Sequence, residues 1–174
     1  MGLYGLRPFF LLSALSAFSA VKSFFGWISA MSDKLLADYP VVVEQAVVWG
    51  DMDSYRHVNN VVYFRYFENA RLEYFRRLDW FAFEKETGVG PILAATHARF
   101  RKPLTYPDVI LIAARVPEVG RDRFTIEHRI VSRSLGAVTT EGEGTIVTYD
   151  YGRGAKVSVP EELRRRIAAL EGRE

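Results

Sequence analysis

The sequence predicts an α+β domain in which a curved antiparallel β-sheet packs on one long central helix. Three observations lead to this fold class. Residues 41–49 are rich in β-branched residues, as strands are. Apolar residues then recur at three- and four-residue steps over residues 60–78, which is the period of a helix. Strand-like stretches joined by short turns occupy residues 92–150.

The predicted helix over residues 60–78 carries a wide apolar stripe. Its main positions are Tyr63, Tyr66, Phe67, Ala70, Tyr74 and Leu78, and the stripe is widened by Phe64, Leu72 and Phe75. A stripe of this width indicates a helix that is covered on more than one side. On the outer face the spacing predicts ion pairs of Glu68 with Arg71, and of Glu73 with Arg76 and Arg77.

The chain after this helix reads as one short helix and four strands. The short helix is expected over residues 79–87, ended by the breaker cluster Gly88-Val89-Gly90-Pro91. The strands are expected at residues 92–100, 109–116, 123–134 and 137–150. Pro160 is at a favourable first-turn position for a terminal helix that extends to about Leu170.

Residues 1–30 differ in kind from the domain expected over residues 31–174. From Pro8 to Ala30 they read PFFLLSALSAFSAVKSFFGWISA, with Lys22 as the only charge. They fit a secretory signal, a membrane anchor or an extension from a misassigned start codon. The first two interpretations imply export or membrane contact through residues 1–30. The third is favoured because Met31 opens a natural start for a compact cytoplasmic domain.

The composition excludes several classes of function. The 174 residues favour one domain, and 49% apolar with 25% charged residues is typical of a folded protein. A net charge of +2 without a basic stripe does not favour nucleic-acid binding. The absence of cysteine excludes disulfides, thiolate metal sites and a cysteine nucleophile. The three histidines lack metal-ligand spacing, and no GxSxG, P-loop or GxGxxG string is present.

The most polar stretch, GDMDSYRHVNN at residues 50–60, leads directly into the apolar helix. It is either an ordinary loop with a helix cap or a site that does chemistry. A helix N-terminus offers free N–H groups and a partial positive charge, which suit a developing oxyanion. A carboxylate close by could act as a nucleophile or activate a water molecule.

Strings in this region resemble those of the hotdog-fold acyl-CoA thioesterases, nearest to the branch of 4-hydroxybenzoyl-CoA thioesterase. They are WGDMD at residues 49–53, HVNN at residues 57–60, Tyr63, and ENAR at residues 68–71. The resemblance covers about residues 41–160 and is sharpest from Trp49 to Phe75. Plant acyl-carrier-protein thioesterases carry a similar string, so the motif marks the superfamily better than the substrate.

The resemblance implies that Asp53 is the catalytic carboxylate and that the main-chain N–H of Asn60 polarises the thioester carbonyl. Arg56 departs from the pattern, because many relatives have glycine before the histidine. This difference leaves the shape of the loop open.

Roles for the neighbouring residues keep two alternatives each. Asn59 caps the helix or positions the water or thioester, and His57 fixes the loop or faces the substrate. Asp51 is expected to orient the loop. Tyr63 and Phe67 are expected to lie in the core or to line an acyl pocket.

Cations at two turns are candidates for binding the phosphates of coenzyme A. They are Arg121 and Arg123 at one turn and Arg153 with Lys156 at the other. Each could equally be a solvated turn residue.

The resulting prediction is an acyl-CoA thioesterase that releases a carboxylic acid and free coenzyme A. The resemblance further implies a homodimer or homotetramer with sites at the interface, and no metal or redox cofactor. Alternatives are an acyl-carrier-protein thioesterase, an enoyl-thioester hydratase or a non-catalytic acyl-CoA or lipid-binding module. The presence of Asp53 argues against the last, since a binding pocket has no need of a charge beside the thioester.

Overall fold

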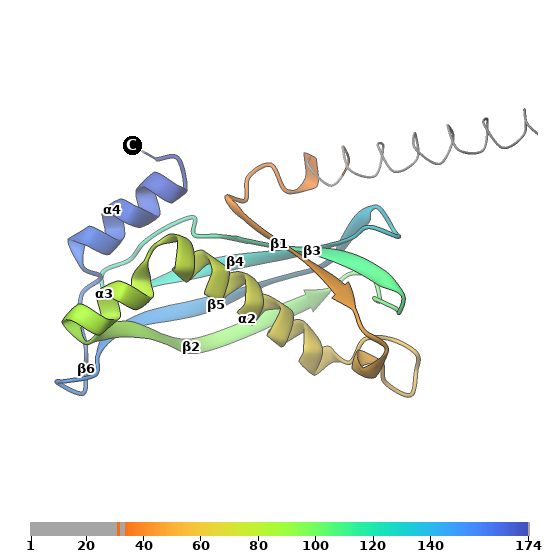
Figure 1. The fold of residues 1–174 in the computed structure, drawn as a ribbon, viewed down its shortest axis with the longest axis horizontal. Coiled ribbons are helices and arrows are strands. Elements are labelled where there is room, and N and C mark those ends of the chain that lie inside the picture. Colours follow the sequence, from red (N-terminus) through yellow and green to blue (C-terminus); the bar gives the residue numbers. More distant parts are fainter. Residues whose placement is uncertain (1–30, 32–33, 174) are drawn as a thin grey trace, which may run out of the picture.

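The computed structural model describes residue 31 and residues 34–173 of the chain. Over these residues the strands form one antiparallel sheet in the order β1-β3-β4-β5-β2, and a short strand β6 pairs with β5. The strands are β1 (Val41–Val47), β2 (Val89–Phe100), β3 (Asp108–Arg115), β4 (Arg123–Ser132), β5 (Ala137–Asp150) and β6 (Ala155–Lys156). The helices are α2 (Asn60–Arg77), α3 (Trp80–Thr87) and α4 (Glu161–Leu170). Figure 1 shows α2 lying across one face of the curved sheet, as predicted.

Helix α2 provides much of the core. All six main positions of its predicted stripe are buried. They pack with the alternate side chains of β4, such as Phe124, Ile126 and Ile130. Phe75 widens the stripe as expected, but Leu72 does not, because its side chain is 44% exposed.

The ion pairs predicted on α2 are present, but the one with Arg71 does not lie on the outer face, because Arg71 is only 8% exposed. Glu73 accepts from Arg76 at 2.7 Å and from Arg77 at 3.1 Å. Glu68 lies 3.7 Å from Arg71. These pairs have the i,i+3 and i,i+4 spacing of neighbouring side chains on a helix, as predicted.

Residues 88–91 were predicted to separate the short helix from the next strand. This prediction is correct for Gly88 and wrong for the other three residues. Gly88 ends α3 with a left-handed backbone, φ 73°, but β2 already begins at Val89. Pro91 lies inside this strand, paired with Thr148 of β5. Proline is tolerated there because β2 is an edge strand, whose outer side needs no N–H donor.

The first strand is also shorter than predicted. β1 ends at Val47, where its register with β3 reaches Asp108, the first residue of that strand. Without a partner strand, Trp49–Asp51 form a turn of 3-10 helix instead. Trp49 is thereby turned outward and is 76% exposed.

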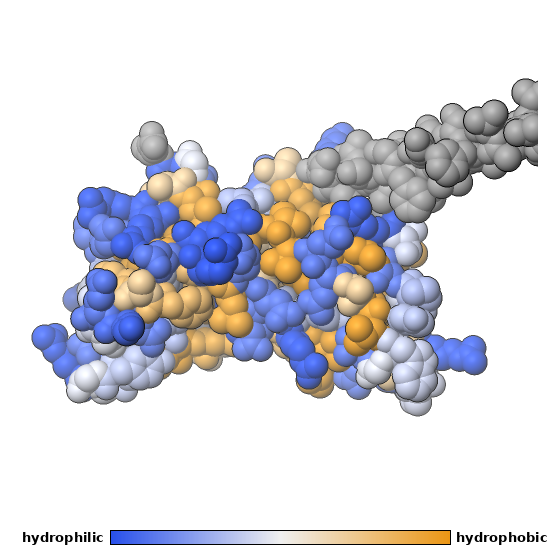
Figure 2. Space-filling view, in the orientation of Figure 1, coloured by the Kyte–Doolittle hydropathy of each residue, from blue (hydrophilic) through white to orange (hydrophobic). Residues whose placement is uncertain are grey.

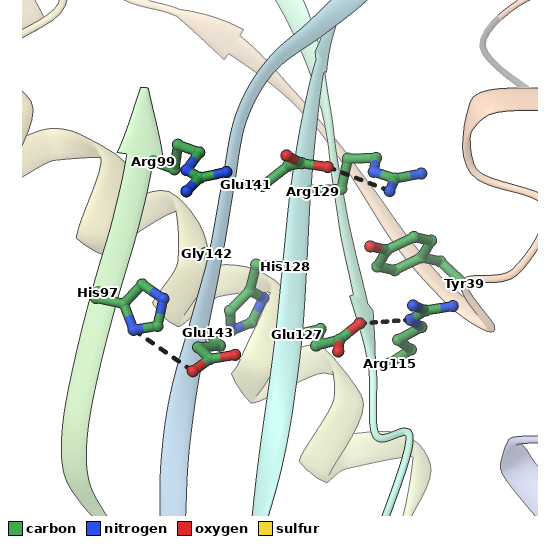
Figure 3. A pocket seen from close by; sticks show the side chains of 10 residues that line it. All are labelled: Tyr39, His97, Arg99, Arg115, Glu127, His128, Arg129, Glu141, Gly142 and Glu143. Carbon is green, nitrogen blue, oxygen red and sulfur yellow. Dashed lines mark hydrogen bonds and ion pairs between the residues drawn. The ribbon is translucent and has the colours of Figure 1, made fainter. Parts of the chain in front are cut away.

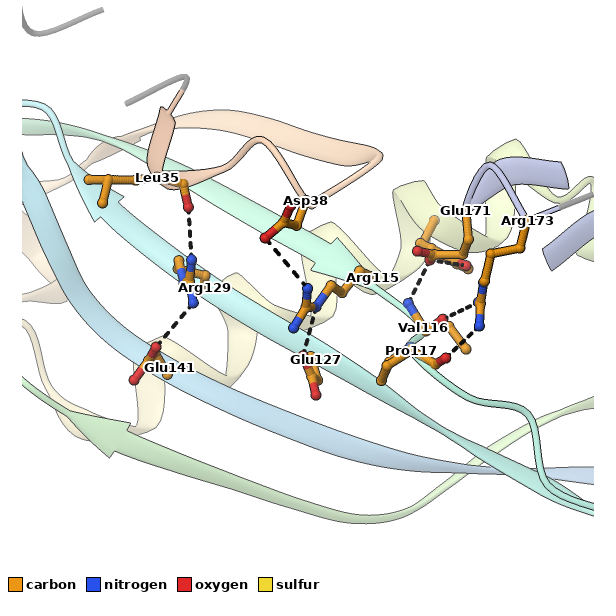
Figure 4. A network of polar contacts seen from close by, with 11 residues as sticks. Leu35, Asp38, Arg115, Val116, Pro117, Glu127, Arg129, Glu141, Glu171 and Arg173 are labelled. Atoms are coloured by element: carbon orange, nitrogen blue, oxygen red, sulfur yellow. Dashed lines mark hydrogen bonds and ion pairs between the residues drawn. The ribbon is translucent and has the colours of Figure 1, made fainter. Parts of the chain in front are cut away.

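Residues 34–40 cross the face of the sheet that α2 does not cover, called here the outer face. Tyr39 lies between the guanidinium groups of Arg115 and Arg129, 4.9 Å and 5.1 Å from its ring centre (Figure 3). Arg129 also donates to the carbonyl of Leu35 at 2.8 Å (Figure 4). These contacts tie the start of the described domain to β3 and β4.

The residue that follows the C-terminal helix is tied to the same end of β3. Glu171 Oε1 accepts hydrogen bonds from Tyr74 Oη at 2.7 Å and from the N–H of Val116 at 2.6 Å. Figure 4 shows Glu171 beside Val116 just beyond the end of β3. The end of the described chain therefore holds both the central helix and the sheet.

The interpretations of residues 1–30 as signal, anchor or extension concern residues outside the described part of the chain. Among the described residues, no helix is both long enough and apolar enough to cross a membrane.

Candidate active site

The loop between the 3-10 turn and α2 folds back on itself. The N–H of Asp53 donates to the carbonyl of His57 at 2.8 Å, and the N–H of Arg56 donates to the carbonyl of Asp53 at 3.0 Å. Val58 donates to the carbonyl of Leu104 at 2.9 Å, which fastens the loop to the turn after β2. Backbone hydrogen bonds therefore hold the loop together and fasten it to the turn after β2.

Arg56 has a left-handed backbone, with φ 62°. Glycine reaches this conformation without cost, whereas it costs other residues about 1–2 kcal/mol. The loop thus has a conformation that suits glycine, although arginine occupies the position. The departure at Arg56 therefore does not change the shape of the loop to one that excludes glycine.

The carboxylate of Asp53 uses one oxygen to hold the loop. Asp53 Oδ1 accepts from the N–H of Tyr55 at 2.8 Å and from the N–H of His57 at 3.3 Å. Oδ2 accepts no hydrogen bond from residues 34–173. One oxygen is therefore fixed in orientation while the other is available to a bound molecule.

Asn59 caps the first turn of α2. Its Oδ1 accepts from the N–H of Val61 at 3.0 Å, and its carbonyl accepts from the N–H of Val62 at 2.9 Å. Among the described residues, the N–H of Asn60 has no acceptor, as expected for the first turn of a helix. This N–H and the positive end of the helix dipole are thus available to an anionic group.

Asp53 and the start of α2 border one open hollow of about 340 Å³, called here the Asp53 hollow. The loop contributes Asp53, His57 and Val58 to its wall, and α2 contributes Asn60 and Tyr63. Four of the residues predicted for the site are thereby brought together. The backbone of His57 fixes the loop, and the residue is exposed and lines the hollow.

The opposite wall was not foreseen. It consists of Phe100, Arg101, Lys102 and Pro103, at the end of β2 and in the turn after it. Arg101 lies 2.6 Å from Glu141, whereas Lys102 is exposed and has no ion pair among the described residues. The basic run at residues 99–102 was a signal for this wall, but only the fold places it opposite Asp53.

Asp51, the first aspartate of the pair, orients the loop. Its Oδ2 accepts from Tyr66 Oη at 2.9 Å, and its carbonyl accepts from the N–H of Asn59 at 2.9 Å. Burial raises the pKa of Tyr66, and the hydrogen bond to Asp51 adds to the rise. Asp51 is thus occupied with a protonated phenol and does not border the Asp53 hollow.

Phe67 does not line the Asp53 hollow. Its ring is fully buried in the core and is stacked on His128, with centroids 4.8 Å apart. A role in binding the acyl group stays a prediction for this residue.

The arginines proposed for coenzyme A also lie away from this hollow. Phe100 pairs with Thr140 of β5, whereas Arg123 pairs with Val147, seven residues further along that strand and thus about 23 Å away. Arg123 is paired with Asp122 at 2.8 Å, and Arg153 with Asp150 at 3.4 Å. Arg121 is exposed at the same end of the sheet. Their contact with coenzyme A stays a prediction.

A second hollow of about 650 Å³ lies on the other side of Asp53. Trp49, Met52, Arg56 and Tyr106 line it together with Asp53 and Gly50. Trp49 and Tyr106 are 76% and 50% exposed, so this second hollow has an aromatic rim. Asp53 therefore stands between two spaces that an extended substrate could occupy.

A third hollow, of about 340 Å³, lies on the outer face of the sheet (Figure 3). Its charges are largely compensated in pairs, such as Arg115 with Glu127 at 2.7 Å and Arg129 with Glu141 at 3.3 Å. It lacks the pairing of a free carboxylate oxygen with a free N–H that marks the Asp53 hollow.

The family model described as the thioesterase-like superfamily matches residues 47–167, which include the loop, α2 and strands β2 to β6. The chain belongs to this superfamily. A thioesterase from Thermus thermophilus, crystallised with coenzyme A and zinc, is 32% identical. The match covers 79% of this chain and 98% of that one, with a TM-score of 0.68.

Two other thioesterases show how far this likeness extends. The long-chain acyl-CoA thioesterase FadM of Escherichia coli is 22% identical over 119 residues, which are 68% of this chain and 90% of FadM. The DHNA-CoA thioesterase of Staphylococcus aureus is 18% identical, covers 76% of this chain and 93% of that one, and has a TM-score of 0.66. The latter likeness shows the fold alone. The hotdog fold and the class of thioester hydrolase are thereby confirmed for this superfamily member.

Proposed function

We propose that the chain hydrolyses an acyl-CoA thioester to a carboxylic acid and free coenzyme A at the Asp53 hollow. Asp53 is the reacting carboxylate, and the N–H of Asn60 is the donor to the carbonyl oxygen. The observation that carries the proposal is that a carboxylate oxygen and a helix N–H, both without partners among the described residues, border one hollow.

The chemistry follows from these two groups. As a nucleophile attacks the carbonyl carbon, the carbonyl oxygen gains negative charge, which the Asn60 N–H and the end of α2 stabilise. Asp53 either attacks directly, forming an anhydride that water hydrolyses, or takes a proton from an attacking water. In both routes the C–S bond breaks and the sulfur leaves as coenzyme A thiol after gaining a proton.

The choice of coenzyme A rests on the relatives and on charge. FadM is named for long-chain acyl-CoA, and the Thermus thermophilus enzyme was crystallised with coenzyme A. At the Asp53 hollow, Arg101 and Lys102 provide cations for phosphate groups. Arg121, Arg123 and Arg153 are the alternative set, contributed from the other end of the sheet.

The proposal includes a homodimer or homotetramer and a cytoplasmic location. Large apolar side chains are exposed close to the site: Trp49 is 76%, Tyr55 82% and Val61 66% exposed. Figure 2 shows apolar surface on the face that carries α2 and α3. A second copy that covered this surface would also shield the thioester from water.

Release of free thiol from a panel of acyl-CoAs tests the proposal, with wild type compared to Asp53→Asn. The variant is expected to lose at least about 10²-fold in kcat, the scale for removal of a catalytic base. Asp38→Asn is the matched control, because Asp38 is an exposed aspartate on the outer face of the sheet. It should retain wild-type turnover.

Two results would overturn the proposal. Equal rates in wild type and Asp53→Asn would remove Asp53 from the chemistry. Loss of the enoyl absorbance of an enoyl-CoA without release of thiol would indicate a hydratase instead.

A further inference from the structure

Tyr63 borders the Asp53 hollow and yet is almost completely buried, with 3% of its surface exposed. In the proposed mechanism Tyr63 has no role. A buried phenol beside a reacting carboxylate invites the question of what its hydroxyl group binds.

The ring of Tyr63 is fixed in place by its neighbours. Phe100 meets it edge-on with centroids 5.0 Å apart, and Tyr66 does so at 6.1 Å. Tyr63 follows Asn60 by three residues in α2, so both lie on the same face of the helix. Helical side chains point back toward the N-terminus, which directs the Tyr63 ring over the turn that begins at Asn60.

The hydroxyl oxygen of Tyr63 accepts a hydrogen bond from the N–H of Leu104 at 3.1 Å. A phenol has a proton to donate in addition to its acceptor positions. Among the described residues, no acceptor receives the Tyr63 proton. Because Tyr63 borders the hollow, a molecule bound there can supply the missing acceptor.

The proton stays on the hydroxyl group under ordinary conditions. Burial raises the pKa of Tyr63, and the negative charge of Asp53 raises it further, against a lowering by the Leu104 N–H. Tyr63 is therefore a donor and not a base at the pH at which Asp53 is charged.

We infer that Tyr63 Oη–H donates a hydrogen bond to the thioester carbonyl oxygen, as a second oxyanion donor beside the Asn60 N–H. This role rests on the proposed thioesterase activity. No proton is transferred in the step. The carbonyl oxygen gains negative charge as the new C–O bond forms. It loses this charge when the C=O double bond re-forms and the C–S bonding pair leaves with the sulfur. Two donors from one helix turn then point at the atom where charge develops.

Tyr63→Phe tests this role, because it removes the hydroxyl group and keeps the ring against Phe100. Removal of an oxyanion donor typically lowers kcat by about 10²–10³-fold. We expect such a loss with KM changed by less than about threefold, since the donor acts mainly in the transition state. The change also leaves Leu104 N–H without its acceptor, so the melting temperature is expected to fall.

Tyr74→Phe is the matched control for that structural loss. It removes the hydroxyl group of another buried tyrosine, which is bonded to Glu171 on the far side of the domain. Both variants should lose stability, but only Tyr63→Phe should lose kcat when both are assayed well below their melting temperatures. Equal kcat losses in the two variants would reduce Tyr63 to a packing residue.

The carbonyl stretching frequency of a bound thioester reports the hydrogen bond directly. In Asp53→Asn, bound acyl-CoA labelled with ¹³C=O should absorb at lower frequency than in water. Adding Tyr63→Phe should shift the band back upward. A band that does not move when Tyr63→Phe is added would overturn the inference. If proteins with Tyr63→Phe are too unstable to study, a band in Asp53→Asn at the frequency found in water would overturn it instead.

These results separate the inference from the proposed function. A wild-type protein that cleaves no acyl thioester contradicts the proposed function. Normal kcat in folded Tyr63→Phe, with an active wild type and an inactive Asp53→Asn, contradicts the role of Tyr63 alone.

Discussion

Phe67 and His128 are stacked face to face, with ring centroids 4.8 Å apart and planes inclined by 11°. His128 is 1% exposed, and its ring nitrogens make no well-aligned hydrogen bond among the described residues. Burial lowers the pKa of His128 to about 3, and the nearby positive charge of Arg71 contributes to this. The imidazole is therefore neutral in the folded protein.

This neutral histidine is expected to make the fold sensitive to acid. In the unfolded chain His128 takes up a proton below pH 6.5, whereas the folded protein resists protonation down to about pH 3. The unfolded state thus binds more protons in this window, so stability falls with decreasing pH, by up to about 1.4 kcal/mol per unit. The free energy of unfolding, measured with urea at several pH values, should change less between pH 6.5 and about pH 4 in His128→Leu than in wild type. The same dependence of stability on pH in both proteins would contradict this role of His128.

Gly142→Ala is expected to destabilise the fold by about 1–3 kcal/mol, the usual cost of overpacking. A Cβ atom there would lie 2.5 Å from Cε2 of Phe67 and 2.6 Å from the carbonyl oxygen of His97. The second contact is with backbone, which cannot move aside easily. Gly50→Ala is the control for stability, because nothing lies within 4 Å of its added Cβ. Urea unfolding of the two variants gives the comparison, and equal midpoints would contradict the close approach.

Arg56→Gly is expected to raise the free energy of unfolding by up to about 1 kcal/mol. It relieves a left-handed conformation costing about 1–2 kcal/mol, and the greater freedom of glycine in the unfolded chain offsets part of the gain. Arg121→Gly, at an exposed position without positive φ, should lower stability. Thermal unfolding measures both changes. A less stable Arg56→Gly would show that the side chain holds the loop.

Lys102→Ala is expected to raise KM for an acyl-CoA about three- to tenfold, at little cost in stability. Its exposed ammonium lies at the Asp53 hollow without an ion pair among the described residues, so its loss costs mainly contacts with phosphate. A short N-acetylcysteamine thioester, which lacks phosphates, should show no change. If Arg153→Ala raises KM and Lys102→Ala does not, the arginines at the other end of the sheet bind coenzyme A.

The fold was largely predictable because its signals are local. The helical period of residues 60–78 and the alternation in residues 123–130 depend on which side chains the core buries, and both elements formed as predicted. Pro91 was misjudged because its effect depends on whether its strand lies at the edge of the sheet. Trp49 is not part of β1 because β3 offers no residue to pair with it. Only the register of the two strands reveals this.

The site was predictable on one side only. Asp53, His57, Asn59 and Asn60 are close together in sequence, so a single motif could name them. Phe100 and Lys102 reach the same hollow from some forty residues away. Their position depends on the pairing of β2 with β5, which no short string encodes.

The two walls of the Asp53 hollow come from separate parts of the chain, and this bears on how such an enzyme can change its substrate. The reacting groups are fixed by the loop and the first turn of α2, whereas the facing wall belongs to an edge strand and a turn. Mutations at residues 101–103 can therefore alter what this wall binds while leaving the loop, the first turn of α2 and the contact of Phe100 with Tyr63 intact. A library randomised there would be a direct route to altered recognition of the thiol carrier.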